Sequence, residues 1–201
     1  MMDTMSTTRD SDTARKAMID SQLRTSGVNE EFVLARMINV PREDFLPEDK
    51  ANLAYIDRSI ALGADGFLAS PLFYGKLLLE AAPKPTDRVL VIEGGTGYLA
   101  ALTAPLVADV TCVSAADAAA GKLPDGEFSL ILIDGAIEQL PGALADIVAE
   151  NGLIVSGLLL RQVSRLASGR KVAGQISLSP VEDIGIPVLT AFNRPKGWTF
   201  S

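Results

Sequence analysis

The chain has 201 residues, 48% hydrophobic and 21% charged, which is typical of a globular protein rather than a disordered one. The formal net charge of −7 argues against nucleic-acid and anionic-membrane partners, because both are bound by clustered Lys and Arg. The chain contains no histidine, which excludes Ser-His-Asp and Cys-His catalysis and ordinary zinc sites, so we expect no metal. Any chemistry must proceed without an imidazole base.

The apolar stretches are too short to span a membrane, and the polar N-terminal segment lacks the pattern of a secretory signal. We therefore expect a cytoplasmic protein with no membrane partner. The single cysteine, Cys112, lies in an apolar strand, which predicts a buried and unreactive thiol.

The first part of the chain is expected to be helical. Residues 1–11 are polar and predict a flexible terminus. Helices are predicted over 13–27, ending at Gly27, and over 29–40, with Asn29 as the N-cap. An irregular connection then ends at Ser70-Pro71, a favourable start for a helix over 71–82. Residues 12–70 thus form a module of helices and a loop.

Strands and helices alternate from residue 71 onward. Strands are predicted over 88–92, 109–113, 128–134 and 153–160, with helices from about 97 and over 139–150. The tail from residue 171 predicts short antiparallel strands. This order favours an α/β fold with a mostly parallel, Rossmann-like sheet over 71–201, so that residues 12–201 form a single domain.

The glycine turn after the first strand is compatible with two cofactor classes. Its spacing Gly94-x-x-Gly97-x-x-Ala100 is close to the nicotinamide fingerprint, and Asp117 lies about where a ribose-binding acid is expected. A short-chain dehydrogenase also needs a downstream Tyr-x-x-x-Lys, and the last tyrosine of this chain is Tyr98. The dehydrogenase hypothesis therefore fails on the sequence.

A second set of motifs is more specific. "VPREDFLP" (40–47), "AYIDRSIALG" (54–63) and "ASP" (69–71) precede the first strand, and "GTGYLAA", "FSLILIDGAIEQLP" and "NGLIV" follow in order. Over residues 14–158 the chain resembles the protein-L-isoaspartate O-methyltransferase family in the order and spacing of these segments. The resemblance implies the Rossmann-like fold of class I methyltransferases.

The resemblance also implies a reaction. The family transfers a methyl group from S-adenosylmethionine to the carboxyl of isoaspartyl residues in damaged proteins, as a step of protein repair. The implied partner is an isoaspartyl-containing peptide or protein. A carboxylate is already a nucleophile at neutral pH, so the enzyme must mainly align the reactants and exclude water. A chain without histidine is compatible with this chemistry.

Aligned on the family pattern, the cofactor loop has changed. The family's acid near the strand end falls on Val91 and its first glycine on Glu93, whose Cβ disfavours a positive φ. The acid that ends the second strand becomes Ser114, with Asp117 as a substitute or a solvated loop residue. Asp134 ends a buried strand at the edge where ligands bind, or makes a turn with Gly135. The predicted cofactor-binding residues are Glu93, Gly94, Gly95, Thr96, Gly97, Ser114 and Asp134.

The segment between the second and third predicted strands is short. Only residues 115–127 separate Ser114 from Phe128, too few for the helix, strand and loop that the family places there. We expect the family's third strand and its helix to be lost or shortened, and one wall of the adenosine pocket with them.

The substrate side has two candidate catalytic residues, Ser70 and Asp57. The serine of the family's Ser-x-Pro segment aligns with Ala69, so Ser70 is displaced by one place and also suits a helix cap. Asp57 matches the Ala-Tyr-x-Asp segment, although loop aspartates often only make turns. Arg58 beside it is either a partner for a substrate carboxylate or a solvated side chain.

Two functions remain open on the sequence. The first is an S-adenosylmethionine-dependent protein carboxyl methyltransferase. The second is a catalytically degenerate homologue that acts as a binding or interaction module. In the second case the shortened sheet leaves an edge that can pair with a partner or with a second copy of the chain as a homo-oligomer.

Overall fold

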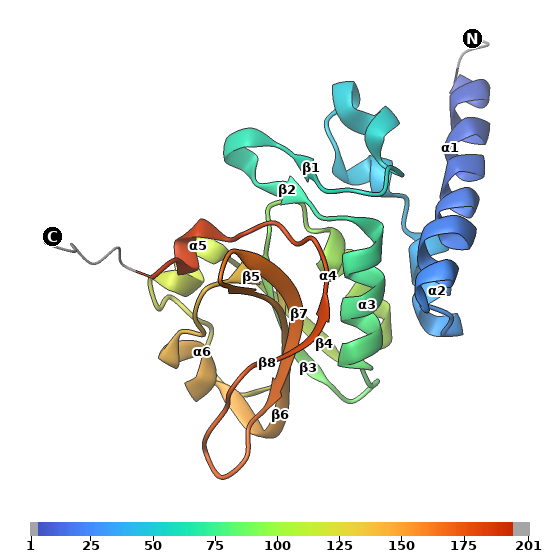
Figure 1. Cartoon of the computed structure of the whole chain (residues 1–201). Helices are drawn as coiled ribbons and strands as arrows, with labels where there is room; N and C mark the ends of the chain where they lie inside the picture. The colour runs from blue at the N-terminus through green and yellow to red at the C-terminus, as the bar shows by residue number, and fades with distance from the viewer. Residues whose placement is uncertain (1–3, 195–201) are drawn as a thin grey trace, which may run out of the picture.

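The computed structural model describes residues 4–194 and is built around a six-stranded sheet (Figure 1). The strand order is β4-β3-β5-β6-β7-β8, with the first four strands parallel and β7 and β8 antiparallel. The α/β, Rossmann-like sheet is therefore confirmed. The strands are β3 (Arg88–Glu93), β4 (Asp109–Ser114), β5 (Phe128–Ile137), β6 (Val148–Leu160), β7 (Val163–Arg170) and β8 (Ser179–Asp183).

Alternate residues of the central strands face two separate cores. Val89 and Val91 of β3 face one cluster, whereas Leu90 and Ile92 face the other, as the two-residue period of a strand requires. The first cluster lies against α3 (Pro71–Ala81), α4 (Tyr98–Thr103) and the N-terminal helices. The second lies against α5 (Ala115–Ala119) and α6 (Gly142–Asp146) on the opposite face (Figure 1).

The N-terminal helices differ from the prediction at their starts. Helix α1 (Thr4–Met18) begins within residues 1–11 and continues through a π-helical turn (Ile19–Leu23) and a 3-10 turn (Arg24–Ser26). It ends as predicted at Gly27, which has φ +84°. Helix α2 (Glu31–Asn39) begins after Glu30, so the N-cap predicted at Asn29 is wrong.

The connection between α2 and α3 consists of short turns and one small hairpin. The hairpin pairs β1 (Ile60–Ala61) with β2 (Phe67–Leu68), outside the main sheet. It lies beside the carboxyl end of β3, where the Phe67 N–H donates to the Gly94 carbonyl oxygen. Besides Arg24–Ser26, the described residues form 3-10 turns at Arg42–Phe45, Glu48–Leu53, Gly63–Asp65, Ala104–Leu106 and Thr190–Phe192.

Strand β4 is the edge of the sheet, and the segment 115–127 forms only α5 and turns. Within residues 4–194 the family's third strand is thus missing, as its short segment predicts. Cys112 is exposed on this open edge, so the prediction of a buried thiol is wrong. An apolar strand alone does not show whether another strand covers it.

Two further boundaries were wrong. Helix α6 is only Gly142–Asp146, shorter than predicted. Strand β6 begins earlier than predicted, at Val148, because Asn151 and Gly152 lie inside the strand at a register irregularity. Asn151 adopts φ +64° there, so the pair bends the strand instead of preceding it. No helix in the described residues is long and apolar enough to cross a membrane.

Candidate active site

Arg42 connects the three motifs that precede the sheet. Its side chain is fully buried, with Nε 2.7 Å from the Ala54 carbonyl oxygen and Nη2 2.7 Å from that of Ala69. The guanidinium lies 5.6 Å from the ring centroid of Tyr74 and 5.1 Å from that of Tyr98. Arg42 therefore fixes the segments that carry Asp57 and Ser70, through charged hydrogen bonds and cation–π contacts.

Ser70 is the N-cap of α3 and borders a cavity of about 580 Å³, the Ser70 cavity. Its Oγ accepts a hydrogen bond from the Phe73 backbone N–H at 3.3 Å, which confirms the predicted helix cap. A capping hydroxyl keeps its own proton to donate. The cavity is lined by Asp57, Arg58, Ser59, Ser70, Leu72, Ser164, Ile184, Gly185, Ile186 and Pro187.

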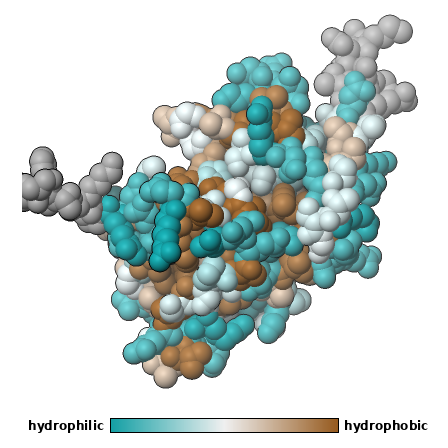
Figure 2. Space-filling model, in the orientation of Figure 1, coloured by the Kyte–Doolittle hydropathy of each residue, from teal (hydrophilic) through white to brown (hydrophobic). Residues whose placement is uncertain are grey.

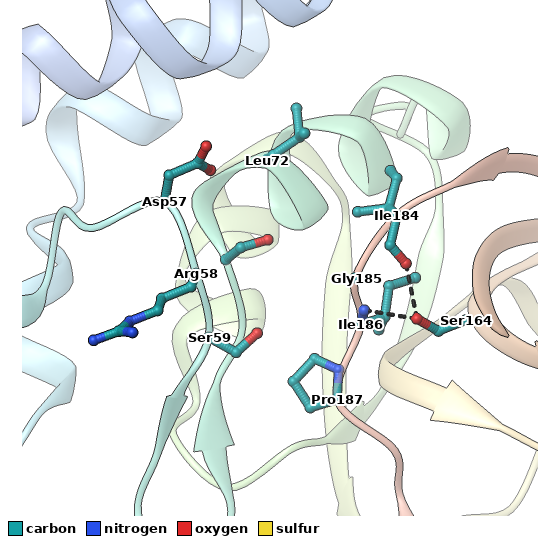
Figure 3. Close-up of a pocket in the computed structure, with 10 residues that line it drawn as sticks. Asp57, Arg58, Ser59, Leu72, Ser164, Ile184, Gly185, Ile186 and Pro187 are labelled. Carbon is teal, nitrogen blue, oxygen red and sulfur yellow. Dashed lines mark hydrogen bonds between the residues drawn. The ribbon is translucent and has the colours of Figure 1, made fainter. Parts of the chain in front are cut away.

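Asp57 and Arg58 are exposed and line the same cavity as Ser70. The structure thus brings together the two predicted catalytic residues, Ser70 and Asp57. Figure 3 shows the Arg58 side chain extending away from Pro187 and Ile186, so its guanidinium does not face the opposite wall. A role for these residues in substrate binding stays a prediction.

The glycine loop follows β3 without the strain expected at its first position. Glu93 is the last residue of β3 and pairs with Ser114, so it is extended, and positive φ occurs at Gly95 (+122°) and Gly97 (+73°). The expectation that a Cβ at residue 93 conflicts with the turn is wrong for this reason. Glu93 Oε2 accepts a hydrogen bond from the Gly97 N–H at 3.0 Å, and Oε1 is buried without a partner. Burial raises the pKa of Glu93.

The β1–β2 hairpin packs directly on this loop. The Phe67 N–H donates to the Gly94 carbonyl oxygen at 3.1 Å. A Cβ on Gly66 would lie 2.1 Å from that oxygen, and a Cβ on Gly94 would lie 2.5 Å from the Asp134 carbonyl oxygen. The backbones are thus in contact, which only glycine permits at these two positions.

Asp134 lies beneath Gly94, in an irregular part of β5. The ladder to β6 skips from Leu132 to Ala136, which turns the intervening residues out of regular pleating. The Asp134 side chain is fully buried; Oδ2 accepts a hydrogen bond from the Tyr74 hydroxyl at 3.3 Å, and Oδ1 has no partner. Burial, and next the charge of Glu93, raises the pKa of Asp134 to about 7.

A second cavity, the glycine-loop cavity, has a volume of about 450 Å³ and lies over the ends of β3 and β4. Among the residues whose side chains the structure describes, Glu93 supplies the only charge in this lining. Such a site favours a ligand with a positive charge and disfavours a phosphate group. Its lining consists of Gly63, Ala64, Gly66, Phe67, Glu93, Gly94, Gly95, Ala115, Ala116, Val188, Leu189, Thr190 and Ala191.

Four predicted cofactor residues lie outside this lining. Ser114 caps α5, where its Oγ donates to Asp117 Oδ2 at 2.8 Å, and Asp117 also pairs with Lys122 at 3.2 Å. Thr96 Oγ1 accepts from the Tyr98 N–H at 3.3 Å within the turn. Gly97 begins α4, and Asp134 is covered by Gly94. Their binding roles stay predictions, whereas Glu93, Gly94 and Gly95 line the cavity.

One segment that the sequence did not reveal borders both cavities. Residues 184–187 line the Ser70 cavity and residues 188–191 the glycine-loop cavity, so we call 184–191 the strap. The Ala136 N–H donates to the Pro187 carbonyl at 2.7 Å, and the Leu189 N–H donates to the Ala136 carbonyl at 2.8 Å. Ser164 Oγ bonds Ile184 and Ile186 (Figure 3). In the sequence, the only sign of the strap is an apolar run that contains Gly185 and Pro187.

Comparison with known proteins gives a consistent result. The family model described as protein-L-isoaspartate(D-aspartate) O-methyltransferase matches residues 13–120. The protein-L-isoaspartate O-methyltransferase 1 of Rhodopseudomonas palustris is 30% identical, over 85% of this chain and 77% of the relative. That of Koribacter versatilis is 28% identical, over 84% and 87%. The chain belongs to this family.

Solved structures of the family have the same fold. A Plasmodium falciparum protein described as a protein-L-isoaspartate O-methyltransferase, in complex with S-adenosyl-L-homocysteine, aligns with a TM-score of 0.70 at 16% identity. The alignment covers 89% of this chain and 97% of the other. A second protein-L-isoaspartate O-methyltransferase structure gives a TM-score of 0.67, also at 16% identity, over 87% and 65%. The class I methyltransferase fold predicted from the motifs is thus confirmed.

The loop geometry also separates the two cofactor classes weighed on the sequence. A nicotinamide dinucleotide places its pyrophosphate on the N–H groups at the start of the first helix. In this family member the Glu93 carboxylate already takes the Gly97 N–H, and its negative charge repels phosphate. A cavity lined by the Glu93 carboxylate instead suits a cofactor that carries positive charge, such as S-adenosylmethionine.

Proposed function

We propose that the chain is an S-adenosylmethionine-dependent protein carboxyl methyltransferase that acts on isoaspartyl residues of damaged proteins. The observation that carries the proposal is the pairing of two cavities along one strap in a member of this family. One cavity is lined by Glu93, whose buried Oε1 has no partner, and suits a cation; the other is lined by Ser70. Within this proposal the chain works in the cytoplasm, where S-adenosylmethionine is made.

The cofactor side of the site rests on Glu93 and the two glycines after it. Bound S-adenosylmethionine supplies an electrophilic methyl group on a positively charged sulfur. Glu93 Oε1 offers a buried negative charge to the cationic part of the ligand, and Gly94 and Gly95 present backbone without side chains to its surface. Phe67, Val188 and Leu189 form an apolar part of the lining, which reduces the hydration of a bound ligand.

The substrate side needs alignment and no general base. A substrate carboxylate in the Ser70 cavity accepts the free Ser70 hydroxyl proton as a hydrogen bond, which orients one oxygen toward the strap. Leu72, Ile184 and Ile186 form an apolar wall that reduces the solvation of that carboxylate. Asp57 and Arg58 at the rim supply groups for the backbone of a peptide substrate.

The test is a methylation assay with S-adenosylmethionine labelled in its methyl group. The substrates are two peptides that differ only in an isoaspartyl or an aspartyl residue at one position. The proposal predicts base-labile label in the isoaspartyl peptide and a background level in the aspartyl peptide. Equal background in both peptides at saturating cofactor would contradict it.

A second candidate is a degenerate homologue that serves as a binding module. One observation in its favour is that β4 ends at Ser114, whose hydroxyl bonds Asp117, so the end of β4 supplies no carboxylate to the cavity. The other is that β4 is an open edge of the sheet. A homo-oligomer formed along that edge belongs to this candidate. It predicts no cofactor binding, and a mass in solution above that of one chain.

A further inference from the structure

Two carboxyl groups lie together under the glycine loop with little compensation. Asp134 and Glu93 influence each other electrostatically, and each has one buried oxygen without a partner. Tyr74 donates to Asp134 Oδ2 from α3, and Gly94 lies directly against the Asp134 carboxyl group. Two neighbouring carboxylates in a dry site repel each other, so the pair is short of positive charge.

The buried cation that acts on Asp134 does not neutralise the pair. Arg42 faces Asp134 from the 3-10 turn Arg42–Phe45, and among the groups that act on the Asp134 pKa it has the smallest effect. Its Nε and Nη2 donate to backbone carbonyls, and the guanidinium lies against the rings of Tyr74 and Tyr98. Nη1 is buried without a hydrogen-bond partner, so it forms no hydrogen bond with either carboxyl group. The remaining open side of the pair is the glycine-loop cavity, which Glu93 lines.

We propose that Asp134 is a specificity-determining residue, whose buried carboxyl group acts with Glu93 to favour the positively charged methyl donor over the uncharged product in the glycine-loop cavity. This inference rests on the proposed function. Asp134 does not touch the ligand; Gly94 separates it from the cavity. It acts through its charge.

The reaction itself changes the charge that this pair meets. When the substrate carboxylate oxygen forms its bond to the methyl carbon, the carbon–sulfur bond breaks and its electron pair stays on sulfur. The sulfonium thereby becomes a neutral thioether, and the carboxylate becomes a neutral ester. With the cation bound, Asp134 releases its proton to solvent; after the charge is lost, it takes a proton back. The pair thus retains the donor and releases the product.

The experiment compares two ligands of similar shape and different charge. Sinefungin has a protonated amine where S-adenosylhomocysteine has a neutral sulfur. Calorimetry on the full chain at pH 6 and pH 8 gives the ratio of their affinities. We expect the ratio in favour of sinefungin to rise about fivefold from pH 6 to pH 8, as a shift of about one unit in the Asp134 pKa requires. In Asp134→Asn the affinity ratio should change with pH only as far as the amine of sinefungin itself titrates.

Asp109→Asn is the matched control, because Asp109 is exposed at the other end of β4 and should keep the wild-type ratio. Should Asp134→Asn not fold, Tyr74→Phe removes the hydroxyl from Asp134 and is expected to move the midpoint of the change to higher pH. A pH-independent ratio in a wild type that binds both ligands would overturn the inference and leave the proposed function standing. So would an Asp134→Asn protein that keeps the wild-type change. A wild type that binds neither ligand would overturn both.

Discussion

The Glu93 carboxylate and the backbone N–H of Gly97 are joined by a hydrogen bond of 3.0 Å across the glycine loop. This bond holds the glutamate at the start of the loop, because the side chain folds back on the loop it begins. It also places the second carboxylate oxygen in a buried position without a partner. Oε2 therefore fixes the Gly97 end of the loop, whereas Oε1 stays unpaired. We expect the Glu93 carboxylate to interact with a positively charged ligand in the glycine-loop cavity.

Replacing Glu93 separates these two effects. Glu93→Gln keeps an oxygen that can accept from Gly97, so it should lose less than about 0.5 kcal/mol in free energy of unfolding, whereas Glu93→Ala should lose about 1–2 kcal/mol. Both should weaken sinefungin binding about tenfold or more, because both remove the charge. Urea unfolding and calorimetry measure the two quantities. Equal ligand affinity in wild type and Glu93→Gln would show that the charge is not used.

Gly94→Ala should be severely destabilising. A Cβ there would lie 2.5 Å from the Asp134 carbonyl oxygen and 2.9 Å from Phe67 Cε2, and neither backbone nor ring can yield easily. We expect a loss of about 2 kcal/mol or more in free energy of unfolding. Gly142→Ala is the control, since a Cβ at Gly142 meets nothing within 4 Å at the start of α6. It should be neutral or slightly stabilising in the same urea titration.

The burial of Asp134 makes stability depend on pH in an unusual direction. The pKa of its carboxyl rises from 3.8 to about 7 on folding, so between these values the native state holds a proton that the unfolded state has lost. Stability from this group is therefore present at low pH and lost as pH rises toward 7. From pH 5 to pH 8, the free energy of unfolding of Asp134→Asn should therefore rise by about 3 kcal/mol relative to that of the wild type. A constant difference across this range would mean that Asp134 is ionised throughout.

Glu93 and Asp134 show which features of the site could be predicted from the sequence and which could not. The order of strands and helices, the missing third strand and the Ser70 cap followed from local patterns and lengths, which act over a few residues. The state of Glu93 did not, because φ at that position depends on whether β3 continues to pair with β4. The burial of Asp134 depends on the hairpin and on Tyr74, which lies sixty residues away.

The strap illustrates the same limit. Its residues 184–191 have no motif, and they enter the site because they pair with Ala136 at the end of β5. Cys112 shows the converse: its strand is apolar, and only the absence of a covering strand exposes the thiol. Both features follow from contacts between distant segments, which periodicity does not record.

Ser70 is expected to have a double role. Ser70→Ala removes both the acceptor for the Phe73 N–H and the free hydroxyl donor, so it should cost about 1 kcal/mol in free energy of unfolding. In the peptide methylation assay it should also raise KM about tenfold. Ser70→Thr retains cap and donor and should keep KM within about threefold. If Ser70→Ala changes stability and leaves KM unchanged, Ser70 is a cap and nothing else.

Cys112 offers an internal reporter of the Glu93 charge. Partial burial and the adjacent Glu93 carboxylate raise the pKa of its thiol to about 11, so the exposed thiol should react slowly with a disulfide reagent at pH 8. Glu93→Gln should increase the reaction rate about fivefold, because it removes the repulsion of the thiolate. Asp117→Asn, which alters a more distant exposed carboxylate, should not. Equal rates in all three proteins would show that Glu93 carries no charge at pH 8.

The most direct measurement is a calorimetric titration of the purified chain with S-adenosylhomocysteine, because every proposal above depends on a ligand in the glycine-loop cavity. The account predicts one binding site per chain with micromolar affinity, weakened by Glu93→Gln and Gly94→Ala. No heat of binding at millimolar ligand would contradict the enzyme and favour the degenerate binding module.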